Sequence, residues 1–395
     1  MKVNPKLVPE LNVITLGHVD HGKSTLTEAL SGKWPAVHTE EKVRGITLRL
    51  GYADVTVYRC GCGYTTQSKC LTCLKECEPV RSFSIIDAPG HETLMATVLA
   101  GSALADGALF VIAANEGVKT QTEEHLKVIE IAGIRNVVVV QTKVDLVTKE
   151  RAMENYEEIR KFLEGTIIED APVIPVSAQQ KVNIDALLEA IQTAIPTPER
   201  DSGADPLFLT ARSFDVNRPG TEISELKGGV LGGGVVSGLL KLGQEIEIRP
   251  GVPGPRGWEP LVTEVRGLKK AGYELEESGP GGLLGVQTGL DPSLTKSDSL
   301  AGSVVGLPGR LPESRSEIEF SFSPIEREGV SSSVKPGETL MITVGVAKSV
   351  GTVRSSGKSV TMSLKIPVCA DRGERVAVSR RISDRWKLIG WGEIV

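Results

Sequence analysis

A glycine-rich loop between an apolar run and a helix constrains this chain more than any other feature. The segment Gly17-His-Val-Asp-His-Gly-Lys-Ser24 follows Val13–Leu16 and fits the pattern G-x4-G-K-S in a strand–loop–helix setting. Its glycines let backbone N–H groups point at phosphate oxygens, and the helix N-terminus adds positive charge. Lys23 can neutralise phosphate charge and Ser24 can bind Mg²⁺. The expected phosphate-binding residues are Asp20, His21, Gly22, Lys23, Ser24 and Thr25.

The order of apolar runs predicts the fold class. Residues 11–195 alternate short apolar runs with segments of 3.6-residue periodicity, which indicates an α/β domain with a mainly parallel sheet and helices on both faces. The expected strands are Val13–Leu16, Phe83–Ile86, Ala108–Ala113, Val137–Val140 and Val173–Val176, and the expected helices include Gln121–Ala132, Lys149–Leu163 and Ile184–Ile195. Beyond a Pro-rich linker, short strands broken by Gly and Pro predict all-β sandwiches or barrels. We place the domains at residues 1–200, 207–308 and 313–395.

Composition excludes several classes of protein. Of 395 residues, 40% are apolar and 24% charged, so a disordered chain is excluded, and the 43 glycines have no three-residue period, so collagen is excluded. The longest apolar run, Val98–Ala114, is interrupted by Asp106, so we expect no membrane partner. Residues 1–10 lack a signal core, and we expect a cytoplasmic protein. Because the net charge is −5, a nucleic-acid partner needs a local basic patch.

Three further motifs follow predicted strands and suit a guanine nucleotide. Asp87-Ala-Pro-Gly90 can hold a metal-bound water and let the backbone approach a γ-phosphate. In Thr142-Lys-Val-Asp145, the carboxylate can accept hydrogen bonds from guanine N1 and N2, whereas adenine would leave it unpaired. The stem of Lys143 can cover the base. In Ser177-Ala178-Gln179, a backbone N–H can meet guanine O6.

A fifth motif, Arg44-Gly-Ile-Thr47, is a candidate switch. Thr47 can coordinate Mg²⁺ while a γ-phosphate is present and release it after hydrolysis. Five motifs in this order, at positions 17, 47, 87, 142 and 177, predict a GTP-hydrolysing switch. The alternative of another class is a guanine-nucleotide-binding scaffold that does not hydrolyse GTP.

The residues resemble those of a known family. Gly17–Ser24, Arg44–Thr47 and Asp87-Ala-Pro-Gly-His91 look like the translational GTPases, whose architecture is a GTPase domain followed by two β-barrels. More narrowly, the chain is similar over essentially its whole length to the family of gamma subunits of archaeal-type translation initiation factor 2. The segments that carry this similarity are Leu50–Asp54, Gly90–Ala96, Arg212–Asn217, Lys227–Gly233, Leu290–Lys296, Gly302–Gly306, Val378–Ile382 and Arg385–Gly390.

The resemblance implies GTP-dependent carriage of methionylated initiator tRNA to the small ribosomal subunit, with alpha and beta subunits as partners. It assigns magnesium to Asp20, Ser24, the Gly45 carbonyl and Thr47, and it makes His91 the residue that orients the attacking water beside Asp87. Alternatives within the architecture are an elongation-type or selenocysteine-specific aminoacyl-tRNA carrier, and a metabolic GTPase subunit without tRNA.

One residue departs from the family pattern. Thr142 stands where the family usually has Asn in Asn-Lys-x-Asp. A threonine hydroxyl is shorter than an amide and offers one donor. Because Asp145 is retained, we expect guanine preference to survive with a weaker grip on the base.

Five of the six cysteines fall within eighteen residues, in an insertion at about residues 59–78. Cysteine pairs in a cytosolic chain favour zinc over disulfides, and the resembled subunit carries a zinc knuckle here, usually built from two C-x2-C pairs. Here the first pair is C-x-C. The expected ligand set is Cys60, Cys62, Cys70 and Cys73, and the rival set is Cys62, Cys70, Cys73 and Cys77. A knuckle without metal is a third possibility.

The tRNA contacts are the least constrained prediction. The resemblance places the pocket for the charged end of the tRNA near Tyr52, whose ring can pack a thioether or an adenine, or can instead belong to the core. Basic side chains that can meet tRNA phosphates are Arg212, Arg380, Arg381, Arg385 and Lys387.

Overall fold

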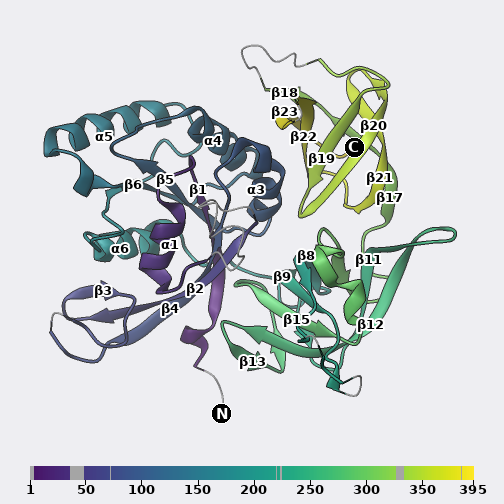
Figure 1. Ribbon diagram of the computed structural model, residues 1–395, viewed down its shortest axis with the longest axis horizontal. Coiled ribbons are helices and arrows are strands. Elements are labelled where there is room, and N and C mark those ends of the chain that lie inside the picture. Colours follow the sequence, from purple (N-terminus) through teal and green to yellow (C-terminus); the bar gives the residue numbers. More distant parts are fainter. Residues whose placement is uncertain are drawn as a thin grey trace. The chain divides into compact units, whose positions relative to one another are not determined.

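A computed structural model describes residues 4–35, 49–71, 73–218, 220–222, 225–325, 333–383 and 385–395. The chain divides into two compact units, Met1–Glu199 and Arg200–Val395, and Figure 1 shows helices in the first and mostly strands in the second. In the described residues, no helix is long and apolar enough to cross a bilayer.

The first unit is built on one seven-stranded sheet. Its strands are β1 (Pro9–Leu16), β2 (Gly51–Cys60), β3 (Gly63–Thr65), β4 (Glu78–Asp87), β5 (Gly107–Ala113), β6 (Val137–Thr142) and β7 (Val173–Pro175), in the order β3-β2-β4-β1-β5-β6-β7. From β4 to β7 neighbouring strands are parallel, whereas β2 pairs antiparallel with both β3 and β4. The predicted mainly parallel sheet is thus confirmed, and the cysteine segment lies at the end of the β2–β4 hairpin.

Helices cover both faces of this sheet because its central strands are apolar on both sides. The helices are α1 (Lys23–Ser31), α3 (Met95–Ser102), α4 (Thr120–Ala132), α5 (Lys149–Leu163) and α6 (Ile184–Ala194), with short 3₁₀ turns at Pro5–Leu7, Glu92–Leu94 and Val144–Leu146. Leu26 of α1 and Leu187 of α6 belong to the same buried cluster as Leu109 of β5. The next residue, Phe110, points to the opposite face and stacks on Phe162 of α5, with 6.4 Å between ring centroids.

The second unit contains two antiparallel barrels. The first includes β8 (Leu207–Phe214), β9 (Val230–Ser237), β11 (Glu245–Gly254), β12 (Gly257–Lys270), β13 (Tyr273–Leu275), β15 (Leu284–Thr288) and β16 (Val304–Gly306), with the small pair β10 (Leu240–Lys241) and β14 (Glu277–Ser278) and 3₁₀ turns at Pro292–Leu294 and Lys296–Asp298. Its order is β11-β16-β8-β9-β15-β12, and a further β11–β12 pairing closes the ring.

The second barrel is also an antiparallel sheet whose two ends are joined. Its strands are β17 (Ser314–Ser321), β18 (Ser323–Pro324), β19 (Thr339–Val344), β20 (Ala347–Ser356), β21 (Ser359–Cys369), β22 (Arg375–Ile382) and β23 (Arg385–Glu393). Their order is β17-β21-β20-β19-β22-β23-β18, and a bridge between Phe320 and Ile394 joins the two ends. Closure leaves each barrel few free strand edges, and each encloses its own apolar core.

Candidate functional site

The glycine-rich loop lies where parallel strands end. It runs from the end of β1 to the start of α1, and Gly22, at φ 88°, is the N-cap of that helix. Asp20 adopts a left-handed backbone with φ 63°, which is strained for a residue with a side chain. Lys23 is 6% exposed, and its Nζ donates to the carbonyls of Gly17 (2.9 Å) and His18 (2.7 Å). Thr25 is half-buried in the first turn of α1. The hydrogen bonds of Lys23 show that the loop is folded and bonded within itself.

The electrostatics of the loop suit an anion. Burial lowers the pKa of Lys23 to about 8, and the carboxylates of Asp87 and Asp20 act in the opposite direction. An added phosphate would favour the charged ammonium. His21 is fully buried, and burial lowers its pKa to about 4, so its ring is neutral near pH 7. Its Nδ1 lies 3.3 Å from the carbonyl of Val111, to which it can only donate.

Two side chains of α4 hold the loop, and the sequence analysis missed both. Nδ1 of the buried His125 accepts from the backbone N–H of Gly17 at 2.9 Å, and Oε1 of Gln121 accepts from that of Val19 at 3.3 Å. Burial lowers the pKa of His125 well below its ordinary value, which keeps that ring an acceptor. Residues 121 and 125 are one helical turn apart and share a face. The sequence signal that could have pointed to them is the four-residue spacing of two polar side chains on one helix.

The end of β4 brings a carboxylate beside the loop. Asp87, fully buried, accepts from Ser24 Oγ at 2.6 Å and from Thr15 Oγ1 at 2.8 Å. Hydroxyl and carboxylate oxygens are the hard donors that Mg²⁺ takes in proteins, so Ser24 and Asp87 fit a magnesium ion. The exposed Asp20 belongs to the same loop. The remaining predicted ligands, Gly45 and Thr47, and the motif Arg44–Thr47 lie outside the described residues.

The segment after Asp87 touches the loop through Gly90. A Cβ at this position would lie 2.5 Å from Lys23 Nζ and 2.7 Å from the backbone nitrogen of Val19, so only glycine fits the close approach. The half-buried His91 follows. Its Nδ1 accepts from the backbone N–H of Thr93 at 3.3 Å and lies 2.9 Å from that residue's hydroxyl. With Nδ1 accepting this bond, the ring nitrogen left to carry a proton is Nε2.

The end of β6 carries the candidate base-reading residues. The hydroxyl of Thr142 donates to the carbonyl of His21 at 2.6 Å. Lys143 has φ 57°, and its Nζ donates to Glu116 Oε1 at 3.1 Å. Burial alone would raise the pKa of Glu116, but the hydrogen bond and charge of Lys143 hold it below its ordinary value. Asp145 is exposed in the next turn. Glu116 was not anticipated from the sequence.

The last motif follows β7. Ser177 is buried, its Oγ accepts from the N–H of Gln180 at 3.2 Å, and its backbone pairs with Val182. Ala178 packs against the buried cluster of the sheet, and Gln179 is exposed. The described residues of four of the five motifs thus lie at the carboxyl ends of β1, β4, β6 and β7. Neighbouring parallel strands from β4 to β7 end at one edge, which is where ligands bind in open α/β sheets.

The cysteine insertion forms a second centre. The thiols of Cys60, Cys62, Cys70 and Cys73 all lie within 4.8 Å of one another, and four sulfurs about 2.3 Å from a shared zinc ion would be equally close. Backbone N–H groups of Cys62 and Cys73 point at the sulfurs of Cys60 (3.3 Å) and Cys70 (3.5 Å). The donor set fits zinc. Cys77 lies outside this set, and its thiol donates to the Lys75 carbonyl at 3.8 Å.

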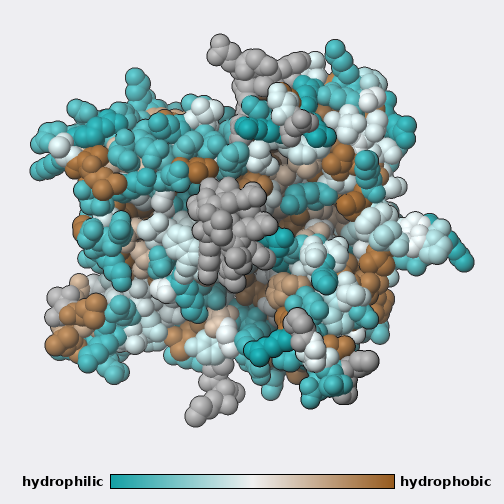
Figure 2. All heavy atoms as spheres, viewed as in Figure 1, coloured by the Kyte–Doolittle hydropathy of each residue, from teal (hydrophilic) through white to brown (hydrophobic). Residues whose placement is uncertain are grey.

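The surface of this insertion carries two exposed leucines among charged side chains such as Lys69 and Lys75. Leu71 and Leu74 are 77% and 68% exposed, and Figure 2 shows brown surface at the end of the first unit where Figure 1 labels β3. The hydrogen bond to Cys73, followed by burial, raises the pKa of Cys62 to about 12. A cluster of thiols therefore resists losing its protons until a cation compensates their charge.

The candidate tRNA residues have varied surroundings. Tyr52 is half-buried on β2, opposite Ile86 of β4. Arg212 and Arg380 each bond an acid of their own unit: Arg212 Nε donates to Asp298 at 2.7 Å, and Arg380 bonds both oxygens of Glu338. Arg381 and Trp386 line a hollow of about 660 Å³ on the second barrel, and Arg385 and Lys387 lie on the same strand as Trp386.

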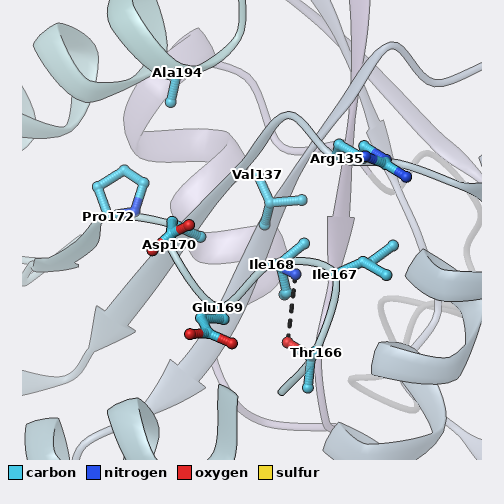
Figure 3. Close-up of a pocket in the computed structure, with 10 residues that line it drawn as sticks. Arg135, Val137, Thr166, Ile167, Ile168, Glu169, Asp170, Pro172 and Ala194 are labelled. Carbon is cyan, nitrogen blue, oxygen red and sulfur yellow. Dashed lines mark hydrogen bonds between the residues drawn. The ribbon is translucent and has the colours of Figure 1, made fainter. Parts of the chain in front are cut away.

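A further pocket lies at the opposite edge of the sheet from the nucleotide loop. It measures about 250 Å³, and Figure 3 shows it between the segment Thr166–Pro172 and the residues Arg135 and Val137. Val137 is the first residue of β6, so the pocket is at the amino end of that strand. Its position separates it from the predicted nucleotide-binding residues.

Known families match both units. The family described as "Elongation factor Tu GTP binding domain" matches residues 9–197, and "Initiation factor eIF2 gamma, C terminal" matches residues 318–394. The chain is 51% identical to translation initiation factor 2 subunit gamma of Methanocaldococcus jannaschii, over 98% of this chain and 97% of the relative. The same subunit of Halorubrum lacusprofundi is 50% identical over 98% of both.

Solved structures share the fold. A bacterial selenocysteine-specific elongation factor EF-Sec matches 97% of this chain with a TM-score of 0.75 and 25% identity, and this chain spans 58% of that one. Elongation factor SelB from Methanococcus maripaludis, in complex with the GTP analogue GppNHp, matches 98% of this chain and 79% of its own with a TM-score of 0.74 and 21% identity.

The fold and the loop at its sheet edge define a translational GTPase, with a parallel-sheet nucleotide unit followed by β-barrels. Within that class, the chain belongs to the family of translation initiation factor 2 gamma subunits, and it is a GTPase of translation initiation. The resemblance and the fold class expected from the sequence are confirmed. The matches to elongation factors do not support the elongation-type alternative better than the matches to gamma subunits support this family.

Proposed function

We propose that this chain carries methionylated initiator tRNA to the small ribosomal subunit, with GTP hydrolysis to GDP as the switch. The observation that carries the proposal is identity of about half of all residues, over nearly full length, to relatives named as the gamma subunit of this initiation factor. In this proposal the alpha and beta subunits of the same factor are its partners. The described surface in Figure 2 is mixed in polarity.

The phosphates are bound by the loop. In this proposal residues 20–25, at the N-terminus of α1, bind them through backbone N–H groups, and Lys23 supplies the neutralising charge. Ser24 and Asp20, with Gly45 and Thr47, would hold magnesium, which when bound neutralises charge between the phosphates. Asp87 fixes the Ser24 hydroxyl by accepting from it.

The base and the water are handled by the other motifs. Asp145 accepts from guanine N1 and N2, Lys143 covers the base while Glu116 holds its ammonium, and the backbone of Ser177–Gln179 meets O6. His91 orients the attacking water, with its ring fixed by Thr93. We retain Tyr52 as the candidate contact to the charged end of the tRNA.

The domain division and the zinc knuckle are part of the same proposal. We place the GTP-binding domain at residues 1–200 and the barrels at 207–308 and 313–395. The proposed zinc ligands are Cys60, Cys62, Cys70 and Cys73, since their thiols lie together. Bound zinc would staple the end of the β2–β4 hairpin.

The test is to purify the protein with a non-hydrolysable GTP analogue and sequence the retained tRNA. Initiator tRNA should be enriched, and a parallel purification with GDP controls for passive RNA binding. Enrichment of elongator tRNA would support the elongation-type alternative, and absence of tRNA would support a metabolic GTPase. Single-turnover GTP hydrolysis with His91→Ala, beside Asp170→Asn at the opposite sheet edge as a matched control, tests the water-orienting role.

A further inference from the structure

Thr142 is bonded to the phosphate-binding loop. It is the last residue of β6 and is 2% exposed. Its Oγ1 lies 2.6 Å from the carbonyl oxygen of His21, and the next carbonyl, of Ile112, is 3.5 Å away. The shorter contact has the length of a strong hydroxyl hydrogen bond, while the longer one is at the limit. The Thr142 hydroxyl therefore donates its one hydrogen bond to the His21 carbonyl.

Counting donors then decides what Thr142 can offer a base. A hydroxyl has one proton to donate, and a carbonyl can only accept. Guanine N7 carries no hydrogen and needs a donor. Thr142 cannot donate to His21 and to N7 at once. An asparagine amide has two N–H donors and can donate to both acceptors. Threonine in place of asparagine therefore keeps the hydrogen bond to the loop and loses the one to N7.

We propose that this site recognises guanine through the N1, N2 and O6 edge and leaves N7 without a contact. The site would therefore accept guanine nucleotides that have carbon at position 7 as well as it accepts GDP. This inference rests on the proposed function, because it assumes that the base lies at Asp145. Thr142 is then a positioning residue for the phosphate loop.

The surroundings of His21 show what the hydrogen bond positions. Its ring is anchored to β5 through Val111, and its carbonyl is anchored to β6 through Thr142. The next residue, Gly22, begins α1, and a Cβ there would lie 3.8 Å from the Thr142 hydroxyl. The loop that binds the phosphates and the strand that presents Asp145 are thus linked through one hydroxyl. Loss of this hydroxyl should therefore weaken the binding of the phosphates, and the effect should be the same for every base.

The test is competition of GDP, 7-deaza-GDP and ADP against a fluorescent GDP on the full chain. For the wild type, we expect GDP and 7-deaza-GDP to bind within about two-fold of each other. Thr142→Asn should open a gap of about 3- to 10-fold in favour of GDP, the worth of one hydrogen bond. Thr142→Ser should behave as wild type. Thr142→Val should weaken GDP and 7-deaza-GDP equally.

Two outcomes would overturn the inference. If wild type binds 7-deaza-GDP at least five-fold more weakly than GDP and the gap closes in Thr142→Val, then the threonine hydroxyl donates to N7. If the gap persists in Thr142→Val, another group reads N7. Failure of the proposed function looks different, because GDP and ADP would then compete equally well. A cooperative thermal unfolding transition, measured for each of the three variants, shows that each one folds.

Discussion

The nucleotide edge of the sheet and the cysteine hairpin at residues 59–78 belong to the same unit but are held in different ways. Behind the nucleotide loop, Val13, Leu109 and Val140 are fully buried, and side chains from α4 and β6 bond the loop itself. At the hairpin, Tyr64 packs against the core of the sheet, but Leu71 and Leu74 face solvent, and the ties among the cysteines are N–H···S contacts and short-range backbone bonds. Packing positions the first region, while the cysteine-bearing end of the second depends on what its sulfurs bind.

This comparison predicts a graded response of GDP affinity. Changes at residues that touch the nucleotide should cost most, changes at residues that hold the loop should cost less, and changes in the hairpin should cost almost nothing. Four experiments with successively smaller expected effects use GDP binding as their common measurement.

Asp145→Asn should have the largest effect. Replacing the carboxylate by an amide places a donor against the guanine N1–H and N2–H₂ groups, so we expect GDP affinity to fall by about 100-fold or more. Fluorescent GDP titration measures it. Asp170→Asn, at the opposite edge of the sheet, is the matched control and should bind as wild type. An Asp145→Asn protein with unchanged affinity would show that this residue does not read the base.

His125→Leu should have the next largest effect. It leaves the buried N–H of Gly17 without its acceptor, and such a loss is worth about 1–3 kcal/mol, or about ten-fold in GDP affinity. His125→Gln supplies a side-chain oxygen and should recover most of the loss. If both variants bind GDP equally, the hydrogen bond from Gly17 does not position the loop.

The pH dependence should be smaller and has a defined sign. In the free protein burial lowers the pKa of Lys23 to about 8, and a bound phosphate favours the protonated amine, so binding takes up a proton above that pH. GDP affinity should be flat below about pH 7 and fall about four-fold between pH 7 and pH 8.5. Lys23→Arg stays protonated and should remove this slope. A slope that persists in Lys23→Arg belongs to another group.

Zinc removal should have the smallest effect on the nucleotide. Cys70→Ser should abolish zinc binding, measured by elemental analysis, and speed amide exchange at residues 60–78, while GDP affinity stays within about two-fold. Cys77→Ser, whose thiol lies outside the four-cysteine set, is the control and should keep its zinc. Zinc loss in Cys77→Ser would select the rival ligand set, and a large fall in GDP affinity would link the two regions.

The architecture was largely predictable because it rests on local patterns. Apolar runs of the right length became β1, β4, β5, β6 and β7, and the periodic segment 149–163 became α5 with the same bounds. The closure of each barrel was not predictable, because it needs pairs such as β11 with β12 and Phe320 with Ile394 that no single strand encodes.

The residues of the candidate site also divide into those that local sequence patterns predict and those that depend on the tertiary structure. The motifs at 17, 87, 142 and 177 could be found because each follows its own strand, and parallel strands carry such ends to one edge. Gln121, His125 and Glu116 had no motif of their own, and they act on the loop or on Lys143 only because α4 and the end of β5 pack there.

By itself, the sequence determined the class of this protein, since the phosphate loop, the motifs after successive strands and the family segments are all local. Tertiary structure alone decided how those parts are used. In sequence Thr142 belongs to the motif predicted to read the base, yet its hydroxyl donates to a carbonyl 121 positions away. The physical reason is that a hydroxyl has one proton, and only the packed fold determines which acceptor receives it.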